Sequence, residues 1–133
     1  IALNYDKNGN VSEEAYFDIN NEPMALVYNH EKPLLSNNVF KTLSKYDARG
    51  NLSESTFQGK NGNFSTLNGV AKYKYKYDKL GHLVEESHYD VHEKPVVNEE
   101  LGYFMKVTVY ANGSNIIQSE DYYDDHKQIL DLF

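Results

Sequence analysis

The sequence predicts an all-β protein in which antiparallel β-hairpin repeats form a curled or solenoid-like meander sheet. Three observations lead to this prediction. A tight-turn motif recurs along the chain, tyrosine and phenylalanine supply all of the aromatic residues, and residues 72–77 alternate strictly between lysine and tyrosine. Tyrosine and phenylalanine favour strands, period-two alternation is typical of a strand, and a repeat of about 20–50 residues is typical of repeat architectures.

The recurring motif is Tyr-Asp-x-x-Gly, followed by a polar residue and then by an aliphatic one. Its complete copies occupy 5–11, 46–52 and 77–83, and a degenerate copy at 110–116 lacks the aspartate and has a displaced glycine. From this spacing we expect one repeat domain of about four units. The expected units are 1–40, 41–71, 72–104 and 105–133.

Turn chemistry explains the motif. Aspartate at the first turn position accepts bonds from backbone N–H groups just ahead of it, and glycine at the fourth takes a positive φ without a Cβ clash. A strand precedes each turn and another follows it, so each copy predicts a hairpin. The turn-defining residues are Asp6, Gly9, Asp47, Gly50, Asp78 and Gly81.

The first unit is longer than the others. A short strand over 1–5 and a strand over 11–17 flank its motif turn, and residues 18–23 form a second turn. Pro23 lies at an edge or a strand start, because proline cannot donate to a sheet ladder. The extra length contains an apolar strand candidate over 24–28.

A further turn is expected at 29–33, where the sequence is similar to 91–95. The second unit then contributes strands over 40–46 and 52–57. A loop at 59–63, rich in glycine and asparagine, leads to the third unit.

Residues 72–77 are the clearest strand in the chain, with tyrosine on one face and lysine on the other. As a helix, the same residues would scatter both types around the axis. The third unit ends in an acidic loop at 98–102, and strands over 103–110 and 116–123 form the fourth. The last segment, 124–133, fits either a final strand or a helical turn capped by Asp124.

The two faces of the predicted sheet are not uniform from unit to unit. When the third and fourth units are aligned on their motif tyrosines, Val107 and Val109 fall on the face that carries Lys74 and Lys76. A curled sheet with both faces partly covered accommodates this difference, and so does a slip in the alignment.

Charge and composition exclude several classes of function. A net charge of −7 and a pI near 5.1 argue against binding to nucleic acid or to anionic membrane surfaces. No run approaches the roughly 18 apolar residues of a membrane-spanning helix. The chain has no cysteine, and it begins at Ile1, so we expect a processed product from which a targeting segment has been removed.

The motif Tyr-Asp-x-x-Gly-Asn/His-Leu/Val-x-Glu resembles the YD repeats of bacterial RHS-type proteins, and the third unit, 69–96, is similar to tandem repeats of bacterial surface and exported proteins. The resemblance implies hairpin units stacked into an extended or curled sheet, without catalytic residues in the repeats. It also implies an exported protein that is periplasmic, secreted or on the cell surface. The irregular spacing and the degenerate fourth copy depart from the family pattern, and four units are too few for a cargo-enclosing shell.

Asp6, Asn8 and Asn10 surround Gly9 with oxygen atoms, as calcium loops do. An EF-hand loop, however, needs glycine at its sixth position and a bidentate glutamate at its twelfth, whereas here glycine is the fourth residue and Glu13 the eighth. Turn chemistry accounts for the same residues, so we expect no metal site.

Other candidate catalytic or metal groups are also better explained by the repeat. His88 and His92 have a spacing that suits a metal on a helix, but they fall on a strand and a turn. The acidic pairs 13–14, 85–86 and 99–100 have neighbouring side chains, which point to opposite faces of a strand. Without a phosphate loop or a nucleophile elbow, we expect no catalytic residues and no cofactor.

The tyrosine stripe formed by Tyr73, Tyr75 and Tyr77 is the candidate ligand-binding surface, because tyrosine is favoured at interfaces and stacks on sugars. The simpler explanation is that the rings cover a thin sheet. We expect a non-enzymatic binding or scaffold module with a protein partner, bound through the sheet face or an edge strand. The alternatives are a carbohydrate-binding module that uses the stripe on cell-surface glycans and an enzyme whose site is built from turn carboxylates.

Overall fold

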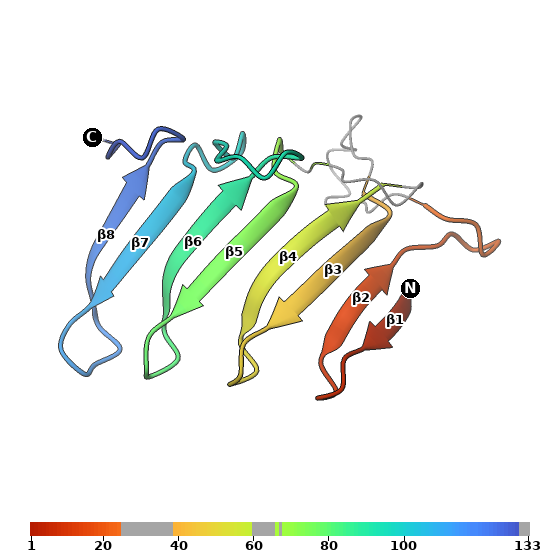
Figure 1. Cartoon of the computed structure of the whole chain (residues 1–133), viewed down its shortest axis with the longest axis horizontal. Coiled ribbons are helices and arrows are strands. Elements are labelled where there is room, and N and C mark those ends of the chain that lie inside the picture. Colours follow the sequence, from red (N-terminus) through yellow and green to blue (C-terminus); the bar gives the residue numbers. More distant parts are fainter. Residues whose placement is uncertain (25–38, 60–65, 67, 131–133) are drawn as a thin grey trace.

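The computed structural model describes residues 1–24, 39–59, 66 and 68–130, and within them all of the regular structure is β-strand. Eight strands form one antiparallel meander sheet in sequence order, and the sheet does not close into a barrel (Figure 1). The predicted all-β fold is therefore confirmed. The strands are β1 (Ala2–Tyr5), β2 (Val11–Ala15), β3 (Lys41–Tyr46), β4 (Leu52–Gln58), β5 (Lys72–Tyr77), β6 (Leu83–Tyr89), β7 (Met105–Tyr110) and β8 (Ile117–Tyr123).

The described part of the chain contains no helix with the length and hydrophobicity that a membrane span requires. Each of the four expected units contains one hairpin, from β1–β2 to β7–β8. The strand candidate at 24–28 lies outside the described residues except for Met24, and the turn at 29–33 lies wholly outside them. The loop at 59–63 is described only at Gly59.

The four hairpins share one register. In each of them the pairing shifts at the motif tyrosine, which is opposite Val11, Leu52, Leu83 or Ile117. Such a bulge bends the strand and increases its local twist. Neighbouring hairpins are joined by shorter ladders at equivalent positions, where Glu14 pairs with Thr42, Ser55 with Tyr73, and Glu86 with Lys106.

Aspartate carboxylates close the motif turns at one end of the sheet. Asp47 Oδ1 accepts the backbone N–H groups of Arg49 and Asn51, each at 2.9 Å. Gly50 has a φ of +85°, in the left-handed region that glycine adopts without strain. Asp6 and Asp78 accept the equivalent pairs of N–H groups.

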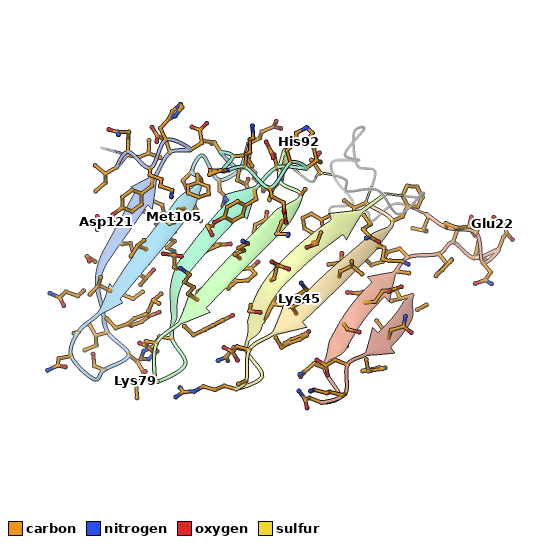
Figure 2. The ribbon with its side chains drawn as sticks, in the orientation of Figure 1. Glu22, Lys45, Lys79, His92, Met105 and Asp121 are labelled. Atoms are coloured by element: carbon orange, nitrogen blue, oxygen red, sulfur yellow. The ribbon has the colours of Figure 1, made fainter. Side chains whose placement is uncertain are left out.

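A second row of aspartate turns lies at the opposite end of the sheet, where His92 is labelled in Figure 2. Its aspartates accept N–H groups two and four residues ahead, and they are Asp18, Asp90 and Asp124. The left-handed position is taken here by Asn21, Glu93 or Lys127. The described residues of 124–133 thus form a turn, which is neither of the two alternatives that the sequence leaves open.

The two faces of the sheet carry different chemistry. We call the side that bears Phe57, Tyr73 and His88 the aromatic face, and the side that bears Lys45, Glu54 and Lys74 the charged face. Cross-strand partners share a face, so the pairing of Tyr73 with His88 and of Lys45 with Glu54 establishes this division. The buried core is formed by Tyr16, Val39 and Phe57 with Met24 and Tyr73 packed against it, so it includes Phe57 and Tyr73 of the aromatic face.

Candidate functional site

The predicted tyrosine stripe lies on β5, and contacts within the protein hold two of its rings. The Tyr73 ring makes an edge contact with Phe57 at 5.8 Å and stacks in parallel on Tyr75 at 6.2 Å between centroids. Its hydroxyl accepts a hydrogen bond from Asn98 Nδ2 at 2.9 Å. The Tyr77 hydroxyl donates to the backbone carbonyl of Leu52 at 2.8 Å. The stripe is therefore part of the packing that joins neighbouring hairpins.

A row of rings continues across the aromatic face beyond the stripe. His88 has no solvent exposure, and its ring lies 4.8 Å from Tyr73 and 5.4 Å from Tyr103. His88 Nδ1 is 3.0 Å from the Tyr103 carbonyl oxygen, which can only accept, so Nδ1 carries the proton and donates. His88 Nε2 has no hydrogen-bond partner among the described residues.

The nearest acidic group to that nitrogen is Glu86, whose Oε1 is 3.7 Å away, beyond hydrogen-bond distance. Burial, and then the charge of Glu86, raise the pKa of the Tyr103 hydroxyl well above its usual value, so the phenol stays protonated. Glu86, His88 and Tyr103 thus form a compact polar group under the loop that contains Asn98. A protonated phenol and a buried imidazole whose Nδ1 donates to a backbone carbonyl serve to position the loop.

A small groove lies beside this group, over β6, β7 and β8. It has a volume of about 120 Å³ and is lined by residues that include Glu86, Lys106, Tyr110 and Glu120. Lys106 Nζ is 3.6 Å from Glu120 Oε1 and lies over the Tyr122 ring at 5.8 Å, so its charge is already balanced. Sites for drug-sized ligands are typically about 300–1,000 Å³, so this groove suits a few water molecules better than a substrate.

The turn carboxylates are occupied by the turns themselves. Backbone N–H groups, that of Asn51 foremost, hold the pKa of Asp47 below its usual value, and Asn51 Nδ2 donates to the second carboxylate oxygen at 3.3 Å. No group of three or more potential metal ligands exists among the residues that the structure describes. Hydrogen bonding within the turn therefore accounts for both oxygens of this carboxylate.

The other predicted pairs do not converge. His88 is buried on β6, whereas His92 is exposed in the second row of turns. Glu85 forms an ion pair with Lys76 at 3.2 Å on the charged face, while Glu86 lies on the aromatic face. The geometry thus follows the alternation of a strand and brings neither pair to a common site.

The charged face carries a ladder of ion pairs, which the sequence analysis did not identify. Its members are Glu13–Lys41 at 2.8 Å, Lys45–Glu54 at 3.4 Å, Glu54–Lys72 at 3.7 Å, Lys76–Glu85 at 3.2 Å and a short Lys72–Glu93 pair. The hydrogen bond that the largely buried Lys72 donates to Glu93 raises the pKa of this lysine. The alternating lysines were visible in the sequence, but their partners depend on the register between hairpins.

This ladder ends at β7. The positions that Lys72, Lys74 and Lys76 occupy on β5 are taken on β7 by Met105, Val107 and Val109. Lys45 lies within the ladder and Met105 beyond it, as the labels in Figure 2 show. Val109 is 44% exposed, and its cross-strand partner is Ser119, where the other hairpins have glutamate. On the last hairpin, apolar side chains therefore replace the lysines of the ladder, and Asp121 and Ser119 lie opposite Val107 and Val109.

No protein-family model matches this chain, and no curated protein matches its sequence.

Proposed function

We propose that this chain is a non-enzymatic interaction module of an exported bacterial protein, built from YD-type hairpin repeats, that binds a protein partner through its last hairpin. The resemblance of the motif at 46–52 and 77–83 to YD repeats supports the repeat class and the exported location. The four hairpins with one shared register agree with such a repeat.

The end of the ion-pair ladder at β7 carries the proposal. On β3–β6, each exposed lysine of the charged face has a carboxylate or a ring beside it, as is typical of a solvated surface. On β7, Val107 and Val109 occupy the positions of the lysines, and their partners on β8 are Asp121 at the rim and Ser119. Depletion of charge at the centre of a patch is typical of protein interfaces. This patch, which we call the valine patch, is the surface we assign to the partner.

The test restores the ladder on this hairpin. The double variant Val109→Lys with Ser119→Glu recreates the Lys76–Glu85 pair at the equivalent position. A displayed library of random peptides is selected on the wild-type protein, and the binders are measured on both proteins by interferometry. We expect their affinity to fall by about tenfold or more on the variant, which corresponds to about 1.4 kcal/mol.

A matched control places the same kind of change on the other face. Lys106→Glu with Glu120→Lys reverses an ion pair on the same two strands without changing net charge, and it leaves the valine patch intact because both residues lie on the aromatic face. Binders that lose affinity equally on both variants would contradict the proposal, as would a selection that yields no binders above background.

One observation favours carbohydrate binding as a second candidate. Tyr73 and Tyr75 lie nearly parallel, with 6° between their ring planes, and aromatic rings are suited to stacking on the face of a sugar. A glycan array probed with wild type and with Tyr75→Ala separates the two candidates. A glycan that binds only the wild type would show that the tyrosine stripe, and not the valine patch, is the functional surface.

A further inference from the structure

At the first two of the three junctions the motif tyrosine bonds to the hairpin before it, whereas at the third Tyr110 stacks on His82. The Tyr46 hydroxyl donates to the backbone carbonyl of Val11 at 2.9 Å, and the Tyr77 hydroxyl donates to that of Leu52 at 2.8 Å. Both acceptors occupy the same repeat position, the residue paired with the motif tyrosine of the earlier hairpin. Tyr5 is the motif tyrosine of the first hairpin, and it is 60% exposed at the edge of the sheet.

The opposite edge offers the matching acceptor. Ile117 pairs with Tyr110 across the last hairpin, as Val11 pairs with Tyr5 and Leu52 with Tyr46. Its carbonyl therefore occupies the position that accepts the tyrosine hydroxyl at the earlier junctions. Among the described residues, β7 is the one strand that pairs with β8, and an isolated bridge joins Tyr123 to Ile129 at the end of β8.

The junction register extends to the same two edges. At the internal junctions, the residue that pairs with the following hairpin is Glu14, Ser55 or Glu86. Its partner on the following hairpin lies the same number of residues before that hairpin's motif tyrosine at every junction. The counterpart on β8 is Glu120, which pairs with Thr108 as Glu86 pairs with Tyr75. The counterpart at the other edge is Ile1, which directly precedes β1. Continuing the repeat thus places Glu120 of one chain beside Ile1 of another.

The backbone groups at both edges point the right way for this pairing. The Tyr16 N–H donates to the Phe40 carbonyl, so the backbone groups of Tyr16 point toward β3. Backbone groups alternate in direction along a strand, so those of Glu14 also point toward β3. The backbone groups of its partner Leu3 therefore point away from β2. On β8, the Tyr122 carbonyl accepts from Leu130. The equivalent carbonyl on β6, that of His88, lies on the side of β7, so the Tyr122 carbonyl lies on the outer side of β8. By the same alternation, the backbone groups of Glu120 also point outward. Each edge therefore presents outward N–H and C=O groups in strand geometry, at Leu3 and at Glu120, while the Tyr122 carbonyl is already bonded to Leu130.

We propose that a second copy of this chain adds its β1 edge to the β8 edge, with the Tyr5 hydroxyl donating to the Ile117 carbonyl. The occupant is a second copy because both halves of the junction are present on the same chain in the register that the chain uses internally. The contact is head-to-tail, so each added copy exposes a new β8 edge and the assembly does not close. The surface differs from the valine patch, and either proposal can fail without the other.

The ladder at this junction is short, so the association is weak. The internal junctions whose register it repeats have three pairs each. Interfaces of this kind lie at the small, transient end of the size range. We expect association from about 10 µM to about 1 mM, to be measured by sedimentation equilibrium of the full chain.

The test uses two edge variants, each blocked at one end. Tyr5→Lys places a charge on β1, and Glu120→Pro removes an outward N–H from β8, where an edge strand tolerates proline. Each variant alone is expected to stay monomeric at concentrations at which the wild type forms a concentration-dependent series. An equimolar mixture is expected to form a one-to-one pair, because it contains one intact β1 edge and one intact β8 edge.

The outcomes separate head-to-tail pairing from its alternatives. Association of the Tyr5→Lys variant alone would indicate β8 on β8, association of Glu120→Pro alone would indicate β1 on β1, and a monomeric wild type would exclude association between copies. Each of these results overturns the proposal. The milder Tyr5→Phe should weaken association about 2- to 10-fold, as loss of one neutral hydrogen bond does. Its matched control, Tyr46→Phe, removes the same bond inside the chain and should leave association unchanged.

Discussion

At the scale of single residues, backbone conformation at the turns decides which substitutions the repeat tolerates. Gly50 has a φ of +85°, and a Cβ added there would meet nothing within 4 Å. The cost of Gly50→Ala is therefore purely conformational. Alanine is strained at this φ, but it also lowers the entropy of the unfolded chain, and the net loss of unfolding free energy is about 1 kcal/mol. Urea denaturation measures it, and an unchanged midpoint would show that the turn relaxes to a different conformation.

The opposite substitution tests the same rule in the second row of turns. Lys127 has a φ of 60° at the position that glycine occupies in the motif turns. Lys127→Gly removes the left-handed strain while adding freedom to the unfolded chain, so we expect a gain between a few tenths and about 1 kcal/mol. The matched control is Lys79→Gly, at an exposed turn position outside the left-handed set, which should destabilise the protein in the same urea assay.

The turn aspartates make stability depend on acid. Backbone N–H groups hold the pKa values of Asp6, Asp47 and Asp90 below the usual value of 3.8. A lowered folded-state pKa contributes stability above the unfolded value, and this stability is lost as the pH falls through the folded value. We expect the urea midpoint to fall with pH below about 4, and less steeply in an Asp47→Asn variant. Parallel curves for the two proteins would contradict this expectation.

At the scale of elements, the last two motif turns are joined by His82 in place of asparagine. His82 Nδ1 is 2.9 Å from Asp78 Oδ2, Nε2 is 2.6 Å from Asn115 Oδ1, and the ring stacks on Tyr110 at 4.2 Å. Both partner oxygens are acceptors, so the hydrogen bonds to Asn115 and then to Asp78 raise the pKa of His82 above 6.5. The protonated ring therefore joins the third hairpin to the fourth.

This arrangement predicts a pH dependence of opposite sign to that of the aspartates. A raised folded-state pKa contributes stability that is fully present below the unfolded value of about 6.5 and is lost as the pH rises through the folded value. Hydrogen exchange at 111–116 should therefore quicken as the pH rises above the unfolded value of about 6.5, beyond its intrinsic pH dependence. In His82→Asn, which restores the residue found at Asn10 and Asn51, this additional change should disappear; its persistence would assign the effect to another group.

At the scale of the whole molecule, the repeat explains both what the sequence predicted and what it did not. Turn chemistry is local, because Asp47 and Gly50 need only the residues between them, so hairpins and sheet order followed from the motif. Side-chain partners are not local: Asn98 donates to the Tyr73 hydroxyl from 25 residues away. The sequence therefore identified the tyrosine stripe but gave no indication of the loop that packs on it.

The second row of turns was harder to recognise for a related reason. Its left-handed positions are Asn21, Glu93 and Lys127, so the glycine signal that marks the first row is absent from them. The signal that remains is an aromatic residue followed by aspartate, with proline in two of the three copies where the bridge closes. The valine patch was visible as a mismatch between Val107 and Lys74, but its meaning depended on the ion pairs that only the register reveals.

A single open sheet also predicts how the molecule unfolds. Each hairpin contacts only its sequence neighbours, and β1 and β8 have one neighbouring strand each. Stability in such an array is a sum of unit and junction terms, so the ends open at lower free energy than the centre. Amide hydrogen exchange should therefore be slowest in β4–β6, near Phe57 and His88, and fastest in β1 and β8.

A substitution at one end sharpens this last prediction. Val107→Ala removes half-buried methyl groups from the β7–β8 hairpin, at a cost of about 1 kcal/mol. In an array, this cost should quicken exchange in β7 and β8 while leaving β1–β4 unchanged, because no strand of the last hairpin touches the first two hairpins. The matched control, Leu43→Ala on β3, should act instead on β2–β4. If either variant quickens exchange equally in all eight strands, the sheet unfolds as one cooperative unit and the junctions between hairpins are as strong as the hairpins themselves.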